Sequence, residues 1–296
     1  MKYYIDEKIK GMEIKSFLNR MKFSNSLVRK LKKDVNGILV NGKHQNVLYV
    51  LKENDVLELN FSDSFDEVNK HLKPIAIPID VIYEDDNITV VNKPPNMPTH
   101  ESINNRENSL ANALAYRYRD KPYVFRASNR LDKDTSGLVI TANNKFYSAL
   151  LSEKIKNHEV IKEYIAVVEG RLEGDGVINA PIDRVGESII KREVRLDGDS
   201  AITEYQSLVA TDVCSVILVK PKTGRTHQIR VHMAHLGHPL LGDSLYGGNT
   251  LYISRQALHC LKMNIKDVAE FYAPLTEDIV NLIRRYFSDD SFIPKN

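Results

Sequence analysis

The chain of 296 residues lacks several features that mark particular protein classes. It has no tryptophan, and its two cysteines, Cys214 and Cys260, are far apart and form no CxxC pair. Neither a disulfide framework nor a thiolate zinc site is therefore indicated, and Cys214, inside an apolar run, is expected to be a packed thiol. No stretch approaches the ~20 apolar residues of a membrane span, and the amino terminus lacks the apolar core of a signal peptide. We expect a cytoplasmic protein that is not bound to a membrane.

Common cofactor and metal motifs are missing too. There is no GxGxxG or GxxxxGK[ST] phosphate loop, no GxSxG elbow, no HExxH pair and no EF-hand pattern. Four of the nine histidines fall within twelve residues. They are His227, His232, His235 and His238. Three-residue spacing would turn the third histidine away from an ion held by the first two, and no acidic base accompanies them. We therefore predict no metal ion and no cofactor.

The net charge is only +2, but it is distributed unevenly. Residues 1–61 contain 12 Lys and Arg against 7 Asp and Glu, whereas the remaining residues are slightly acidic. A basic segment attached to an acidic body is typical of an appended nucleic-acid-binding module.

The basic segment has its own structural pattern. Residues 12–23 space apolar side chains at helical intervals, and a second helix is expected to begin at Ser24 or Asn25 and to end at Asn36-Gly37. This second helix carries leucines on one side and four basic residues on the other. The basic residues are Arg29, Lys30, Lys32 and Lys33. Residues 38–40 and 55–61 read as strands. The basic cluster is either an RNA-binding face or simply a solvated helix face, and the charge asymmetry favours binding.

The remaining chain is dominated by short β-type runs. They include a hairpin around the turn 84–87, and strands at 163–168, 201–209 and 213–219. Helices are expected at 110–118, 146–155, 226–236 and 276–287. Because helices and strands do not alternate strictly, we predict an α+β domain around a mixed, largely antiparallel sheet. The predicted division is a small α/β domain at 1–65, a polar linker at 66–74 and a larger domain at 75–296.

The most informative stretch is SNRLDKDTSGLVIT, residues 128–141. In extended chain Arg130 and Asp132 project to the same side, because residues i and i+2 share a face. A carboxylate beside a cation stays ionised, which suits a nucleophile and a buried ion pair equally well. The following Asp134-Thr135-Ser136-Gly137 reads as a turn.

Two further segments concentrate polar side chains. In Lys162-Glu163-Tyr164 a tyrosine opens an apolar strand, where most tyrosines are core residues with a satisfied hydroxyl. The stretch TGRTHQIRVH, residues 223–232, places Arg225 and His227 near a glycine turn and Arg230 among apolar neighbours. An arginine in such surroundings needs an acidic or phosphate partner, and Asp132 is a candidate.

Together these segments resemble the RluA-type pseudouridine synthases. The similarity is carried, in order, by VVNKPP, NRLDKDTSGL, KEY, TGRTHQIRVHMAHLGHPLLGDSLYG, RQALHC and FYAP. The basic head resembles the alpha-L RNA-binding module that is often fused to these enzymes. One residue departs from the family pattern, because Asn129 stands where the family usually has histidine. The contact made by that side chain is therefore open, to RNA or to neighbouring backbone.

The resemblance implies a pseudouridine synthase fold and a role for each matching residue. Asp132 would be the nucleophile that breaks the uridine N-glycosidic bond, by attack on C6 of the base or on C1′ of the ribose. Tyr164 would stack on the base and help to remove the C5 proton, and Arg230 would pair with Asp132. Arg130 would enter the RNA beside the displaced nucleotide, with Arg225 and His227 also facing RNA. Because the product is an isomer of the substrate, the reaction needs no metal or redox cofactor.

The expected partner is a structured RNA, with large-subunit ribosomal RNA ahead of transfer RNA, and the expected state is a monomer. Two alternatives stay open on the residues. A non-catalytic RNA-binding or ribosome-assembly protein could retain this fold, although Asp132, Tyr164 and Arg230 would then have no function. A nucleoside hydrolase would explain Asp132 but not the basic head.

Overall fold

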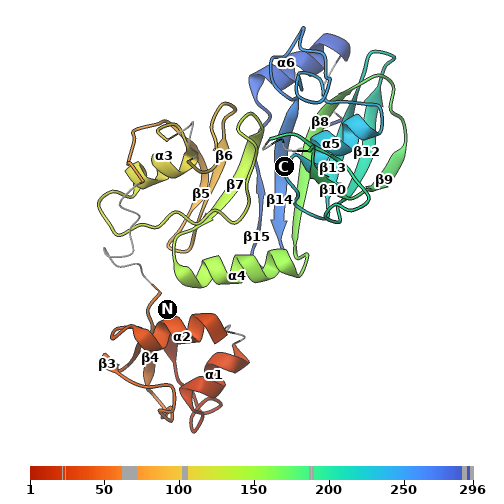
Figure 1. Ribbon diagram of the computed structural model, residues 1–296. Helices are drawn as coiled ribbons and strands as arrows, with labels where there is room; N and C mark the ends of the chain where they lie inside the picture. Colours follow the sequence, from red (N-terminus) through yellow and green to blue (C-terminus); the bar gives the residue numbers. More distant parts are fainter. Residues whose placement is uncertain are drawn as a thin grey trace.

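A small sheet near the amino terminus and a large sheet in the rest of the chain organise the protein (Figure 1). The computed structural model describes residues 1–21, 23, 25–61, 72–101, 106–186, 188, 190–288 and 292–293. The predicted linker at 66–74 falls mostly outside these residues. In the part of the chain that the structure describes, no helix has the length and apolarity needed to cross a bilayer.

Residues 1–61 build the small sheet and two helices. The elements are β1 (Lys2–Tyr4), α1 (Ile14–Arg20), α2 (Asn25–Lys33), β2 (Ile38–Val40), β3 (Lys43–His44) and β4 (Val56–Leu59). The sheet is antiparallel with the order β1-β4-β2-β3. Asn41 and Gly42, both at positive φ, make the tight turn between β2 and β3, as the Asn-Gly pair predicts.

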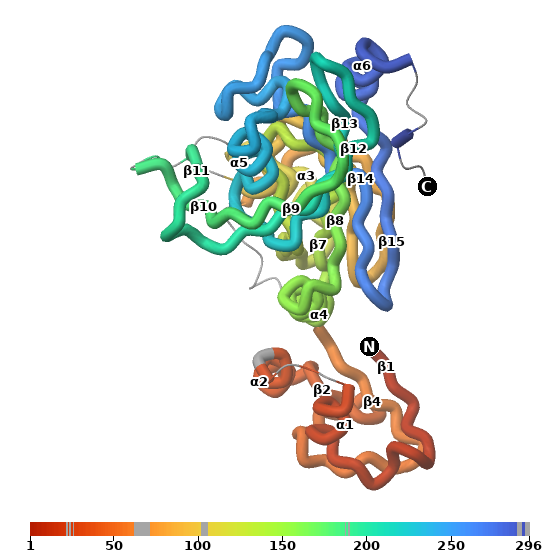
Figure 2. Tube along the Cα trace, turned by 90° about the vertical axis from the view of Figure 1, so that its right-hand side faces the viewer, coloured from red at the N-terminus to blue at the C-terminus, as the bar shows by residue number. Residues whose placement is uncertain are grey.

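Helix α2 is amphipathic, as its sequence predicts. Leu27 and Leu31 are buried against the sheet in a core of its own. The four basic residues of the helix lie on its exposed side. Figure 2 shows α2 on the same side of the molecule as α5 (Gln228–His235) and the hairpin of β10 (Ile182–Arg184) and β11 (Arg192–Val194).

The large sheet is mixed and largely antiparallel, which confirms the predicted fold class. Its strands are β5 (Asp80–Glu84), β6 (Ile88–Lys93), β7 (Ser136–Ala142), β8 (Val160–Glu169), β9 (Asp175–Asn179), β12 (Ile202–Ala210), β13 (Cys214–Pro221), β14 (Leu258–Ile265) and β15 (Ala269–Tyr272). Their order is β5-β6-β7-β14-β8-β13-β12-β9, with β15 added to β14. Only β7 and β14 pair in parallel among the strands described.

The alternation of side chains along β8 assigns a role to each face of the large sheet. Tyr164 and Ala166 point into the core that α5 covers together with α3 (Leu110–Arg117) and α4 (Lys145–Lys156). Ile165 and Val167 point into a second core, which α6 (Glu277–Tyr286) covers. Tyr164 therefore lies beneath α5.

The small unit contacts the large one through aromatic rings. The ring centroids of Phe23 and Phe61 lie 4.8 and 5.1 Å from that of Phe146, which belongs to α4. Such ring pairs stabilise a contact beyond the area they bury.

Most predicted elements are present, with two kinds of difference. Strands β1, β3, β7, β9, β10, β11, β14 and β15 were not predicted, and most of them mix polar and apolar side chains irregularly. Helix α5 begins at Gln228 rather than at Thr226, because His227 adopts a left-handed conformation with φ 58°. Cys214 is buried, as predicted.

Candidate active site

The segment that carries Asp132 is fixed to the end of β7 by side-chain contacts with backbone. The Asn129 amide donates to the Leu138 carbonyl at 3.0 Å, and its oxygen accepts from the Ile140 N–H at 2.9 Å. The Asn129 side chain thus makes two hydrogen bonds with the backbone of β7, as a neighbouring strand would. At this position, where the family usually has histidine, the side chain contacts neighbouring backbone. Leu131 is held from the other side by the Thr99 hydroxyl.

Gly137 is required where this segment joins the sheet. Its φ is +109°, and a Cβ on it would lie 2.3 Å from the Cys260 carbonyl oxygen of the neighbouring strand β14. Only glycine adopts this conformation without strain and lets the two strands approach. The turn of residues 132–135 is therefore seated directly on the parallel pair β7–β14.

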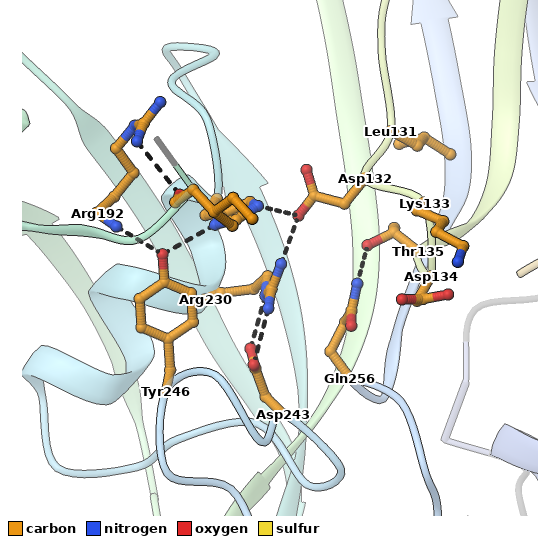
Figure 3. Close-up of polar contacts among 12 residues, drawn as sticks. Leu131, Asp132, Lys133, Asp134, Thr135, Arg192, Arg230, Asp243, Tyr246 and Gln256 are labelled. Atoms are coloured by element: carbon orange, nitrogen blue, oxygen red, sulfur yellow. Dashed lines mark hydrogen bonds and ion pairs between the residues drawn. The ribbon is translucent and has the colours of Figure 1, made fainter. Parts of the chain in front are cut away.

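Asp132 meets Arg230 above this turn, as the sequence predicts. An Asp132 carboxylate oxygen accepts from Arg230 Nη1 at 3.1 Å, and His227 Nε2 lies 3.8 Å from the same oxygen. Asp134 lies on the other side of the loop from Arg230 (Figure 3). The two aspartates consequently have different surroundings, which agrees with Asp134 serving as a turn residue.

Arg230 is held by a second acid that sequence reasoning missed. Its Nε and Nη2 donate to both oxygens of Asp243, at 2.7 and 2.8 Å, and Figure 3 shows the guanidinium between Asp132 and Asp243. Burial alone would lower the pKa of Arg230, but the hydrogen bonds and charge of Asp243, and then of Asp132, raise it above its ordinary value. The guanidinium is therefore a fixed positive charge aimed at Asp132.

Asp243 belongs to the GDSLYG part of the third motif, and its place in that motif was the sequence feature that could have identified it. In this loop Gly242, with φ +79°, packs against the backbone of Arg255, and a Cβ on Gly242 would lie 1.9 Å from the Arg255 carbonyl oxygen. Tyr246 of the same loop stacks under Arg230, with the guanidinium carbon 5.0 Å from the ring centroid. An aromatic face stabilises a cation held over it.

His227 belongs to the pocket rather than to the outer surface. Its Nδ1 lies 2.9 Å from the Tyr246 hydroxyl. Burial lowers the pKa of His227, and its neighbours only partly oppose this effect, so the imidazole is neutral at pH 7. Arg225 differs, because it is exposed and pairs with Asp199 at 3.3 Å.

Tyr164 lines the bottom of the pocket. Only 7% of its surface is exposed, and burial raises its pKa well above the ordinary value, with further contributions from Cys260 and Asp132. The side chain is thus a neutral phenol before substrate binds. Ile229 and Leu258 complete the apolar lining, while Arg130 stands exposed at the rim.

A buried lysine supports the loop that carries Asp132. The Lys93 ammonium donates to the carbonyls of Pro94 and Met97, both at 2.8 Å, and of Lys133 at 3.1 Å. Burial lowers the pKa of Lys93 to about 7, although Asp134 and Asp132 favour its charged form. Lys93 belongs to the VVNKPP motif, but no spacing in the sequence indicates that its side chain contacts the backbone of residue 133.

Arg255 supports the same loop from the sheet side. It donates to the Asp134 carbonyl at 2.9 Å and pairs with Asp278 at 2.6 Å. Gln256 donates to the Thr135 hydroxyl at 3.0 Å. Together with Lys93 and Asn129, these contacts leave the loop little freedom, and such support is how a site keeps its geometry.

Two of the clustered histidines, His232 and His238, make structural contacts away from Asp132. His232 is buried between the Thr203 hydroxyl and the Ala180 carbonyl, at 2.8 and 2.9 Å, and His238 contacts the Glu169 carbonyl at 2.7 Å. No group of three His, Cys, Asp or Glu residues that could hold a metal ion occurs in the described ranges.

Comparisons with known proteins agree on one family. Residues 87–235 match the family described as RNA pseudouridylate synthase. An RNA pseudouridine synthase of Bacillus subtilis, called YjbO and uncharacterised, is 37% identical over 92% of this chain and 99% of its own length. Ribosomal large subunit pseudouridine synthase D of Salmonella typhimurium is 37% identical over 70% of each chain. The chain belongs to the RluA-type RNA pseudouridine synthases.

Solved structures agree with this assignment. Human RNA pseudouridylate synthase domain containing 1 is 28% identical and superposes with a TM-score of 0.56, over 68% of this chain and 85% of the human chain. The human domain containing 4 protein shares the fold at 22% identity, with a TM-score of 0.59 over 70% and 92% of the two chains. The protein is an enzyme that isomerises uridine in RNA to pseudouridine.

Proposed function

We propose that this synthase modifies a uridine of large-subunit ribosomal RNA and that Asp132 is its nucleophile. The observation that carries the assignment is the ion-pair chain Asp132–Arg230–Asp243 at the mouth of a pocket floored by Tyr164. A carboxylate that faces a permanently charged guanidinium remains ionised and aimed, as a nucleophile must be. The ribosomal target is supported by the related synthases D, which act on the large subunit by name.

The reaction moves one bond and conserves all atoms. The N1–C1′ bond of the target uridine breaks, a C5–C1′ bond forms, the C5 proton leaves and N1 gains a proton. Asp132 starts this sequence by attack on C6 or C1′. Tyr164 packs against the base as a neutral phenol, because its burial disfavours a resting phenolate. The target nucleotide has to leave its stack, which costs a few kcal/mol and least in an unpaired loop.

The RNA contacts are assigned by position. Arg130 is exposed at the rim, and it enters the RNA beside the displaced nucleotide. Arg225 lies exposed across the pocket, whereas His227 contacts the nucleotide inside it. The proposed acting form is a monomer.

The small unit at the amino terminus is proposed to be an alpha-L RNA-binding domain of residues 1–65, joined by the linker 66–74 to the catalytic domain 75–296. Its basic residues on α2 are exposed, and α2 lies on the side of the molecule where α5 covers the pocket (Figure 2). A ribosomal RNA segment near the target therefore reaches both.

Mapping of new pseudouridines tests this function. Unmodified ribosomal RNA and transfer RNA transcripts are incubated with the wild type or with Asp132→Ala, and carbodiimide-dependent reverse-transcription stops are compared. A stop in large-subunit RNA that only the wild type produces is expected. A stop confined to transfer RNA would replace the proposed target. RNA left unmodified by both proteins would favour an RNA-binding protein without catalysis.

A further inference from the structure

Lys162 is a cation of the pocket that the mechanism above leaves unused. It lies on β8 two residues before Tyr164, so both side chains project to the face beneath α5. Lys162 lines the catalytic pocket together with Asp132 and Tyr164. It also lines two adjoining grooves, one along residues 127–133 and the other between residues 155–162 and 220–225. Lys162 therefore stands where the pocket opens into the outer grooves.

Four other cations around this opening have carboxylate partners. Lys220 pairs with Glu163 at 2.8 Å and Lys222 with Glu204 at 2.8 Å. Arg225 and Arg230 have the partners described above. The side chain of Lys162, although half-buried, makes no hydrogen bond or ion pair with any residue that the structure describes. A desolvated ammonium without a counter-ion is costly, and its pKa is correspondingly lowered by burial.

We propose that the Lys162 ammonium binds a backbone phosphate of the target nucleotide. This inference rests on the proposed function. A uridine offers one anionic group, its phosphodiester, since the ribose and the uracil are neutral. Asp132 already has Arg230 as its partner, so the free ammonium is not needed there. The base lies deeper, over Tyr164, and the backbone of a flipped nucleotide has to pass the pocket mouth where Lys162 stands. A phosphate at this point replaces the missing counter-ion.

Two substitutions at this position separate charge from other roles. Lys162→Met removes the charge and keeps much of the side-chain length, whereas Lys162→Arg keeps the charge but cannot act as a neutral base. Lys262→Met is the matched control. Lys262 lies opposite Glu163 in the β14–β8 register, so its side chain projects to the face of the sheet opposite to that of Lys162. It lines none of the grooves described above, and its substitution removes the same charge.

Binding is measured with heptauridylate at several salt concentrations. Lys162→Met should weaken binding about tenfold or more and lower the salt slope by about 0.7, the contribution of one phosphate contact on a single strand. Lys162→Arg should restore most of both, and Lys262→Met should resemble the wild type. Heptauridylate with neutral methylphosphonate linkages should bind the wild type worse than the natural oligomer, and Lys162→Met should lose less on this change. Urea unfolding verifies that each variant is folded.

Two results would overturn the proposal. Lys162→Met could bind heptauridylate with the affinity and salt slope of the wild type. Alternatively, Lys162→Arg could be as inactive as Lys162→Met on the mapped RNA while the salt slope stays unchanged, which would assign Lys162 to proton transfer. Heptauridylate binding is measured independently of RNA modification, so a failure of this proposal is distinguishable from a failure of the proposed function.

Discussion

The loop around Asp132 and the basic face of α2 both depend on charge, but they are built in opposite ways. The loop is held by the buried Lys93 and Arg255, and the Asp132 carboxylate faces an arginine that a second acid holds in place. The α2 cations are exposed and make no ion pair among the described residues. Buried pairs are strongly damaged when one partner is lost, whereas exposed charges are screened by water and salt. Under the proposed function, catalysis depends on the fixed geometry of the loop, and attraction of RNA depends on the exposed charges of α2.

The largest effect is expected from Asp243→Asn. Asp243 is 1% exposed and binds Arg230 with both oxygens, so its neutralisation leaves a buried guanidinium partly uncompensated. We expect a loss of about 3–5 kcal/mol in the free energy of unfolding, measured with urea, and a large fall in kcat. Asp199→Asn is the matched control at the exposed partner of Arg225 and should cost at most about 1 kcal/mol. Equal losses of unfolding free energy for the two variants would contradict the distinction between the buried pair of Arg230 and the exposed pair of Arg225.

Gly137→Ala should damage the loop through the backbone alone. The new Cβ would meet the Cys260 carbonyl, and the positive φ is unfavourable for alanine. Strain and overpacking should each cost about 1–3 kcal/mol of unfolding free energy, and pseudouridine formation should fall with the displaced loop. Gly224→Ala, at a pocket glycine with no atom within 4 Å of the added Cβ, should fold like the wild type. A stable Gly137→Ala variant would show that the β7–β14 contact is adjustable.

Lys93→Met should weaken the loop and change how stability depends on pH. The folded-state pKa of about 7 lies below that of an exposed lysine, about 10.4, so between these values the unfolded chain binds more protons. Wild-type stability should therefore gain up to about 1.4 kcal/mol per pH unit from this residue as pH rises above 7. Lys93→Met lacks this gain and leaves three carbonyls without their donor, at a combined cost of about 1–3 kcal/mol. Urea unfolding at pH 6.5, 8 and 9.5 measures both effects, and parallel pH curves would contradict the assignment.

The smallest effect on stability is expected at α2. Replacing Arg29, Lys30, Lys32 and Lys33 by glutamine should change the unfolding free energy by no more than about 0.5 kcal/mol per site. RNA affinity should fall and its salt dependence should flatten, by about 0.7–0.9 in slope for each phosphate that the helix no longer binds. A variant with lysine or arginine exchanged at the same positions keeps the charge and serves as the control. An unchanged salt slope would make this a solvated helix face without a role in binding.

The same contrast explains what the sequence could predict. Local patterns were sufficient for α2 and for the largely antiparallel character of the large sheet. The pairing of Asp132 with Arg230, 98 residues apart, was expected because a buried arginine needs an acidic partner and because the motifs resemble those of the family. The contact of Lys93 with the Lys133 carbonyl was missed because it joins segments 40 residues apart. Asp243 lies only 13 residues from Arg230, but the path of the loop after α5 cannot be read from local spacing. Asn129 was noticed as a departure, but its two bonds to β7 depend on a register that only the folded chain reveals.

Release of the uracil C5 hydrogen tests the central claim most directly, because that hydrogen is lost only when C5 becomes bonded to the ribose. RNA containing uridine tritiated at C5 is incubated with the wild type and with Asp132→Asn, which keeps the size of the side chain and removes its charge. The account predicts tritium release by the wild type in proportion to the modified sites, and release lowered by several orders of magnitude for Asp132→Asn with RNA binding retained. Release by Asp132→Asn at the wild-type rate would contradict the assignment of Asp132 as the nucleophile.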